Sequence, residues 1–322
     1  MIVRSVAYRN GTSLGDVELD QISEVLKDPG TFLWVGLYEP EESMLRRVQH
    51  EFGLHDLAVE DALHAHQRPK IEAYGETLFL SLVTVRSLDD DTLQFGETHV
   101  FLGPNFIVTV RHGASAAHST LREKCEAAPN LLAKGPTYVL YAILDFIVDH
   151  HQEVAEQMED RFEVLEGEIF NDRFDRAAIA RFYAFKRQLM RLRAAALPVE
   201  DICAQLVHIY EKHVPKDLRA YFRDVADHTA RTVGSLDGLR EMLTTAIQVN
   251  LSLVTVAQNE VVKRLAGWGA VLAIPTIVFS LYGMNFQWMP ELKWPYAYPV
   301  VVGVTAAACI ALYVRLRKGG YL

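Results

Sequence analysis

The chain has 322 residues, enough for two domains of average length, and its formal net charge is −9. That acidity argues against a nucleic-acid-binding protein, because such proteins present basic surfaces to phosphate groups. The mean hydropathy of +0.06 is too low for a chain that lies wholly in a membrane. Most of the uncharged sequence follows Arg264, so the composition predicts a large soluble part and a short membrane part.

The three cysteines, Cys125, Cys203 and Cys309, are far apart and form no CxxC pair. The sequence therefore suggests neither a disulfide framework nor a thiolate zinc site. The first ten residues, MIVRSVAYRN, lack the apolar stretch of a signal peptide, so we expect the N-terminal part to stay in the cytosol. No GxxxxGK[ST] phosphate-binding loop occurs, so the sequence predicts no nucleotide partner.

Residues 1–135 alternate strand-like and helix-like segments, which predicts an α/β domain. Gly103-Pro104-Asn105 is typical of a hairpin turn, and Gly53 of a helix C-cap. The predicted helices are Glu41–Phe52 and Asp56–Ala65, and the predicted strands are Ile2–Tyr8, Phe32–Leu37, Leu78–Val85, His99–Leu102 and Phe106–Val110.

Two long stretches rich in helix-forming residues follow, framed by Pro136 and Pro198 and then by Pro215 and Pro275. Asn171-Asp172 divides the first stretch, so we interpret residues 136–213 as a helical hairpin. Eleven acidic residues between Asp145 and Asp175 indicate either a solvated helix face or a surface that concentrates cations. The second stretch has 59 residues between its prolines, which as one helix would span roughly 90 Å.

The uncharged runs Leu265–Tyr282 and Pro299–Val314 are close to the length of membrane-spanning helices. A buried core hairpin is the alternative, but no polar sequence follows that could cover it. Basic residues flank the cytosolic ends of membrane helices. Lys263, Arg264, Arg315, Arg317 and Lys318 flank the two runs, and the loop between them has only Lys293, so both termini should be cytosolic. Two spans leave no transport path within one protomer, so a pore would need several chains.

These patterns divide the chain into seven segments. They are an α/β cytosolic domain (1–135), an acidic helical hairpin (136–213), a stalk helix (214–264), a first transmembrane helix (265–284), an extracytoplasmic loop (285–298), a second transmembrane helix (299–316) and a basic cytosolic tail (317–322).

The loop opens with Tyr282-Gly283-Met284-Asn285-Phe286 and continues with Met289-Pro290-Glu291-Leu292. This pair of motifs at the outer end of the first span resembles the CorA family of magnesium transporters. The segments His66–Leu82, Tyr138–Asp149 and Tyr221–His228 also resemble that family. The resemblance implies a homopentamer in the cell membrane. Each protomer would have a funnel-shaped α/β cytosolic domain, a long stalk helix continuing into the first span, and a second span outside it.

The resemblance implies that Mg²⁺ enters through a filter of Gly283, Met284 and Asn285, with Co²⁺ and Ni²⁺ carried less well. Mg²⁺ is small and holds its water tightly, so a ring of Asn285 carboxamide oxygens would accept hydrogen bonds from the waters of the ion. A helix C-cap is the alternative role of Asn285. Glu291 in the loop would attract cations toward the pore.

Helical spacing back from Asn285 predicts a pore-lining stripe. Its members are Ser280, Thr276, Ala273, Gly269, Leu265, Val262 and Asn259. Leu265 and Val262 would form an apolar constriction near the cytosolic side, able to gate by dewetting. Close helix packing explains small residues equally well, and the two interpretations are compatible. Pro275 predicts a kink in this helix. Phe279 and Ser280 stand where relatives commonly have small apolar residues.

In the family, an aspartate of the stalk and one from the α/β domain of a neighbouring protomer bind a regulatory divalent ion. The resemblance implies Asp224 and Asp89 for these roles, with Asp90 or Asp91 as substitutes for Asp89. A surface ion pair of Asp224 with Arg223 or Arg231 is the alternative.

Two rival functions remain open. One is a Zn²⁺ transporter of the ZntB type, which shares the architecture. The other is a membrane-anchored cytosolic enzyme or sensor, for which residues 1–260 should carry a catalytic constellation. The sequence contains no nucleophile elbow, HExxH motif or Rossmann glycine pattern, so no enzyme activity is predicted. The scattered histidines match no compact zinc site.

Overall fold

The computed structural model describes residues 2–64, 67–88, 92–113, 118–170, 176–284 and 288–322. The chain divides into two compact units, Met1–Thr244 and Thr245–Leu322. Helix α8 (Arg219–Tyr282) contributes residues to both units, so the boundary lies inside one helix.

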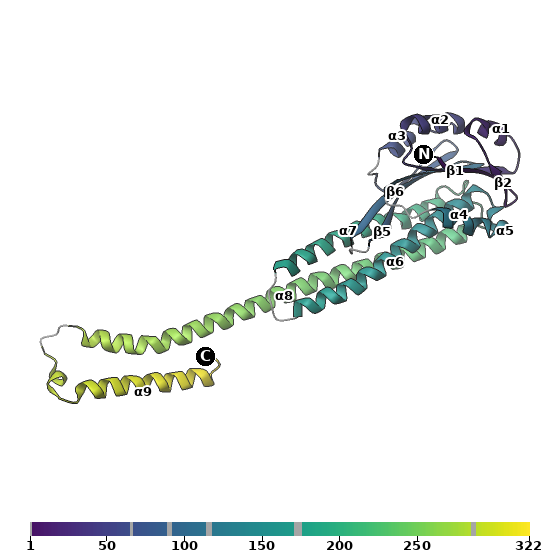
Figure 1. The fold of residues 1–322 in the computed structure, drawn as a ribbon. Helices are drawn as coiled ribbons and strands as arrows, with labels where there is room; N and C mark the ends of the chain where they lie inside the picture. Colours follow the sequence, from purple (N-terminus) through teal and green to yellow (C-terminus); the bar gives the residue numbers. More distant parts are fainter. Residues whose placement is uncertain (1, 65–66, 89–91, 114–117, 171–175, 285–287) are drawn as a thin grey trace. The chain divides into compact units, whose positions relative to one another are not determined.

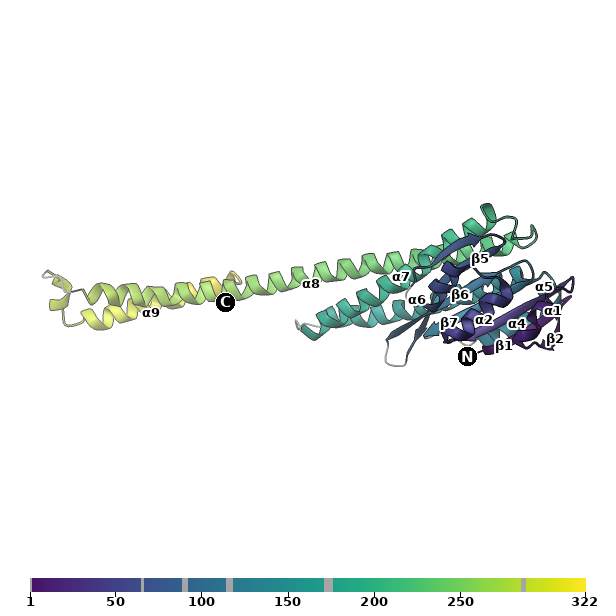
Figure 2. The same ribbon diagram turned by 90° about the horizontal axis from the view of Figure 1, so that it is seen from above.

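The first unit is built on a sheet that has seven strands in the described part of the chain, in the order β2-β1-β3-β7-β6-β5-β4 (Figures 1 and 2). Neighbouring strands are antiparallel except β3 and β7, which are parallel. The strands are β1 (Ile2–Arg9), β2 (Thr12–Asp16), β3 (Thr31–Tyr38), β4 (Lys70–Tyr74), β5 (Thr77–Ser87), β6 (Leu93–Leu102) and β7 (Phe106–Gly113).

Helices cover both faces of this sheet, because alternate side chains of its central strands are apolar in both directions. On β3, Leu33 and Val35 face a core shared with α2 (Glu42–Phe52) and α3 (Asp56–Leu63). Trp34 faces the opposite core. That core contains α6 (Pro136–Phe170), α7 (Arg176–His208) and the first turns of α8, together with the shorter α4 (His118–Glu126) and α5 (Pro129–Leu132). Figure 1 shows α2 and α3 on one side of the sheet and α6 on the other. The short η1 (Leu19–Gln21) and α1 (Ile22–Val25) precede β3.

In the same unit, α6, α7 and the first part of α8 lie side by side (Figures 1 and 2). Arg193 of α7 and Asp237 of α8 form a bidentate ion pair, with Nε–Oδ1 and Nη2–Oδ2 distances of 2.8 and 3.0 Å. Leu236 and Leu239 are buried on the same stretch of α8. An ion pair and buried leucines therefore hold the stalk portion of α8 against the hairpin.

The predicted helices and strands of the α/β domain are present, but β6 begins at Leu93, before the predicted His99, and α3 ends at Leu63, while the predicted end at Ala65 lies outside the described residues. Gly53 has φ = 62° and ends α2 as the predicted C-cap. The sequence missed the edge strands β2 and β4. Residues 136–213, interpreted as a helical hairpin, contain the two helices α6 and α7, and the turn between them lies outside the described residues.

Of the framing prolines, Pro136 begins α6, but Pro198 and Pro275 lie inside helices. Pro198 lies within α7, which continues to His208 because Val199, Ile202 and Leu206 keep this stretch buried. Helix α8 has 64 residues and continues through Pro275, so it is longer than the stretch between prolines. The kink at Pro275 stays a prediction.

The second unit contains the rest of α8, the short η2 (Pro290–Lys293) and α9 (Ala297–Lys318). Among the described residues, α8 and α9 are the two helices long and apolar enough to cross a membrane, with windows of mean hydropathy 1.7 and 2.0. Only 6% and 11% of these windows are buried within the protomer, which is unlike the buried core hairpin considered as the alternative.

Candidate ion-conduction site

One face of α8 packs against α9 and the C-terminal residues. The ring centroids of Trp268 and Tyr313 are 6.1 Å apart, and Cys309 Sγ lies 3.7 Å from the Val271 carbonyl oxygen. A Cβ placed on Gly267 would lie 3.1 Å from the Leu322 side chain, so this glycine permits the close approach. These contacts define the α9-facing side of α8.

The seven residues of the predicted stripe are all exposed in the protomer: Asn259, Val262, Leu265, Gly269, Ala273, Thr276 and Ser280. At about 100° per residue, their mean direction lies roughly opposite the α9-facing side. The exposed fractions of Val262 and Leu265 are 63% and 72%. The stripe is therefore a face of α8 that α9 does not cover, so close packing against α9 does not explain the small residues of the stripe.

Thr276 and Ser280 are the two hydroxyl residues of this face. Thr276 Oγ1 donates to the Leu272 carbonyl oxygen at 2.8 Å, as threonines within helices commonly do. That bond leaves the hydroxyl oxygen of Thr276 available as an acceptor on the exposed face.

Helix α8 ends at the GMN motif. The Gly283 N–H donates to the Phe279 carbonyl oxygen at 2.9 Å, and the Met284 N–H donates to the Leu281 carbonyl oxygen at 3.3 Å. Helical hydrogen bonding therefore extends to Met284. Gly283 and Met284 are exposed. Asn285, whose side chain is the polar group of the predicted filter, lies outside the described residues.

The connection between α8 and α9 carries exposed polar and aromatic side chains. Glu291 and Lys293 are exposed on η2, the short 3₁₀ helix before α9. Trp288 and Tyr298 are 85% and 81% exposed, as residues of an aromatic belt at a membrane surface would be in an isolated protomer.

Asp224 lies on an exposed face of α8 in the first unit. Its Oδ1 is 3.7 Å from His228 Nε2, and neither Arg223 nor Arg231 forms an ion pair with it in the described structure. Within the described part of the protomer, Asp224 therefore meets a histidine and not an arginine. Asp89, Asp90 and Asp91 lie outside the described residues, so the predicted pairing with Asp224 is untested.

The sequence did not single out Asp145 of α6 as an acidic neighbour of Asp224. Burial raises the pKa of Asp145, and the carboxylates of Asp149 and Asp224 raise it further, while the His228 ring opposes the shift. Asp145 belongs to the predicted acidic run, but only its half-buried position near Asp224 selects it from the other members of that run. The described residues contain no cluster of three or more metal-ligating side chains arranged to hold an ion.

Comparisons with known proteins bear on the family and the fold of this chain. The family model described as CorA-like Mg²⁺ transporter protein matches residues 29–318. A cobalt/magnesium transport protein CorA of Thermotoga maritima is 29% identical, over 92% of this chain and 85% of that protein.

Two solved structures extend the comparison to the fold. The complete CorA magnesium transporter of Methanocaldococcus jannaschii aligns over 100% of both chains with a TM-score of 0.81 and 18% identity. The ZntB cytoplasmic domain of Vibrio parahaemolyticus is more distant, with a TM-score of 0.55, 12% identity, and coverage of 70% of this chain and 88% of that one. The α/β domain, the long helix and the two apolar C-terminal helices thus form the CorA fold, and the chain belongs to the CorA-like family of Mg²⁺ transporter proteins.

Proposed function

We propose that the protein is a homopentameric channel through which Mg²⁺ enters the cell down its electrochemical gradient. The observation that carries this proposal is the exposed stripe of α8 on the side opposite α9. Copies of α8 arranged around an axis would turn this face inward, and α9 would lie outside against lipid. A pore lined by one helix per protomer follows from that arrangement.

The filter in this proposal consists of Gly283, Met284 and Asn285. Neutral amide and carbonyl oxygens suit an ion that keeps its first shell of water, because they accept hydrogen bonds without displacing that shell. The Thermotoga maritima relative is named as a cobalt/magnesium transport protein, which supports Co²⁺ as a second ion. Ni²⁺ belongs to the same proposal because it is a divalent ion of similar charge and coordination preference.

The membrane potential supplies the driving force. Moving a divalent cation inward gains about 4.6 kcal/mol per 100 mV, twice the gain of a single charge. With both termini cytosolic, Glu291 would face the outer solution and attract cations to the pore mouth, partly offset by Lys293.

Internal Mg²⁺ closes the channel in this proposal. Asp224 and Asp89 of a neighbouring protomer would bind the ion weakly, since few carboxylates with retained waters make a low-affinity site. Asp145 has a raised pKa beside Asp224, so a divalent ion there would also relieve repulsion between carboxylates. Binding that favours the closed arrangement stabilises it by linkage.

The alternative is a ZntB-like Zn²⁺ transporter. Its support is the fold of the cytosolic domain, which that protein shares at low identity. The Mg²⁺ description of the family model, which covers most of the chain, favours the channel. The same description disfavours a membrane-anchored enzyme or sensor, because the family is one of transporters.

The experiment is cation uptake by the full-length protein reconstituted in liposomes, with an imposed inside-negative potential. We expect Mg²⁺ uptake that rises with the potential, resists competition by Zn²⁺ and is unchanged by a pH gradient. Asn285→Ala should abolish uptake while chemical crosslinking still yields the pentamer. Zn²⁺ uptake driven by the pH gradient would favour the alternative, and normal Mg²⁺ flux through an assembled Asn285→Ala protein would refute the filter.

A further inference from the structure

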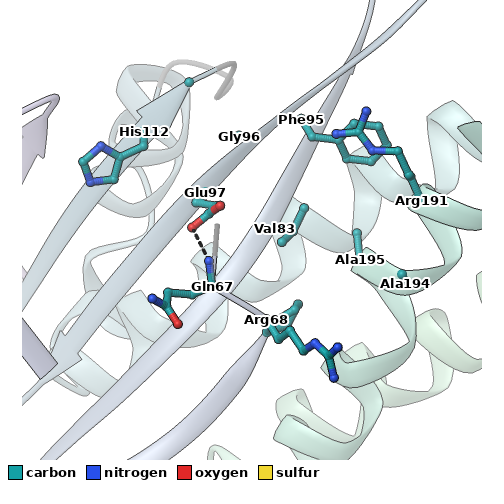
Figure 3. Close-up of a pocket in the computed structure, with 12 residues that line it drawn as sticks. Gln67, Arg68, Val83, Phe95, Gly96, Glu97, His112, Arg191, Ala194 and Ala195 are labelled. Carbon is teal, nitrogen blue, oxygen red and sulfur yellow. Dashed lines mark hydrogen bonds between the residues drawn. The ribbon is translucent and has the colours of Figure 1, made fainter. Parts of the chain in front are cut away.

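A pocket of about 330 Å³ lies within the first unit, and its lining includes none of the described residues proposed for conduction or gating. The segment after α3, the ends of β5, β6 and β7, and one side of α7 surround it (Figure 3). Its volume falls at the lower end of the range for small-molecule sites. Val83, Phe95 and Ala195 give it an apolar wall.

Two arginines line the pocket, Arg68 from the segment before β4 and Arg191 from α7. The guanidinium carbon of Arg191 lies 4.2 Å from the centroid of the Phe95 ring, so stacking fixes the position of this charge. Neither guanidinium meets a carboxylate among the residues that the structure describes. The chain has 41 acidic and 32 basic residues, so carboxylates are plentiful, yet none of the described ones pairs with Arg68 or Arg191.

The acidic and imidazole groups of the pocket already have partners within the fold. Glu97 Oε2 accepts from the Gln67 N–H at 3.2 Å and lies 3.5 Å from His99 Nε2. The ring nitrogens of His112 lie 3.0 Å from a Glu39 carboxylate oxygen and 2.8 Å from the Ala62 carbonyl oxygen. The two arginines therefore supply the charge that the pocket can offer to a ligand.

From this arrangement we infer that the pocket binds a small organic polyanion that carries phosphate or carboxylate groups. In the view of Figure 3, Arg191 lies above and Arg68 below Val83 and Ala195, so the two arginines are separated by an apolar part of the wall. A ligand that reaches both arginines needs anionic groups at two positions, and the wall between them suits an organic core. Planar guanidinium groups bind phosphate and carboxylate oxygens in pairs. Such binding requires no phosphate-binding loop and implies no hydrolysis.

The test uses the purified full-length protein in detergent with EDTA, so that no divalent cation contributes to binding. Isothermal titration with ATP, citrate and inorganic phosphate separates the phosphate-bearing from the carboxylate-bearing class. We expect ATP or citrate to bind and inorganic phosphate, which reaches only one arginine, to bind at least about tenfold more weakly. Binding should weaken as salt is added, because both arginines are solvent-accessible.

Arg68→Ala and Arg191→Ala should each weaken that binding by about tenfold or more. Arg86→Ala is the matched control, because Arg86 is an exposed arginine on β5 that does not line the pocket. Arg191→Lys keeps the charge but loses the planar stack, so it should fall between the parent and Arg191→Ala. The inference is overturned if neither ATP nor citrate binds, or if the two pocket variants bind as the Arg86→Ala variant does.

Discussion

Replacement of Gly269 by leucine tests the assignment of the pore face most directly. Gly269 is exposed on the stripe, and a Cβ built there meets no atom within 4 Å in the protomer. The Gly269→Leu side chain therefore fits the isolated fold, and the helix gains roughly 0.8 kcal/mol because leucine is a better helix former than glycine. Around a pore axis, however, every protomer would add a leucine to the same ring. We expect Mg²⁺ uptake to fall by at least about tenfold, equivalent to about 1.4 kcal/mol of added barrier.

Gly303 of α9 provides the matched control for this experiment. It is also an exposed helical glycine with no atom within 4 Å of its built Cβ, but it does not belong to the stripe. Liposome uptake, crosslinking and a thermal melt should be measured for both variants. Gly303→Leu should conduct like the parent, and neither variant should melt earlier. The assignment fails if an assembled Gly269→Leu channel conducts at the parent rate, or if both variants lose uptake equally.

Three further predictions concern the loop, the sensor and the buried histidine of α6. Glu291→Gln should weaken the apparent affinity for Mg²⁺ at low ionic strength and have less effect as salt is added, and an unchanged Mg²⁺ dependence at low salt would argue against an electrostatic role. Asp89→Asn combined with Asp224→Asn should leave transport active but remove the protection from protease and the flux suppression that high internal Mg²⁺ gives, and retention of both would exclude these residues as the sensor. Burial lowers the pKa of His151 from 6.5 to about 4, so the unfolded chain binds the proton more readily, and stability is lost as pH falls from about 6.5 toward 4. That shift corresponds to about 2 kcal/mol between pH 7 and pH 5, measurable by urea unfolding, and His151→Gln should flatten the pH dependence.

The central strands could be predicted from the sequence, and the edge strands could not. Strands such as β3 are nearly continuous runs of apolar residues that are buried on both faces, so their pattern is local and strong. Strand β2 (Thr12–Asp16) is exposed throughout and contains Gly15. Strand β4 (Lys70–Tyr74) alternates charged and apolar residues over only five positions. These two exist because β1 and β5 offer hydrogen bonds, which is information that lies elsewhere in the chain.

The candidate site could also be predicted only in part, because some of its features follow from local sequence and others from packing. The 3.6-residue period back from Asn285 gave the members of the stripe, but not which side of the helix α9 would cover. That side is set by contacts between residues far apart in sequence, such as Trp268 with Tyr313. The acidic run similarly gave a surface of one charge, while the half-buried position of Asp145 beside Asp224 depends on how α6 packs against α8.

The distribution of apolar side chains along α8 bears on self-association independently of the pore motif. Leu251, Leu253 and Val256 are 59%, 46% and 58% exposed, and they precede the basic pair Lys263 and Arg264 that should mark the membrane surface. Lipid therefore cannot cover these three residues if the proposed orientation holds. A helix in water that exposes consecutive turns of large apolar residues is stable when another surface covers them. Further copies of α8 would supply that surface, and because the helix is continuous to Tyr282, a bundle formed in the cytosol would extend into the membrane.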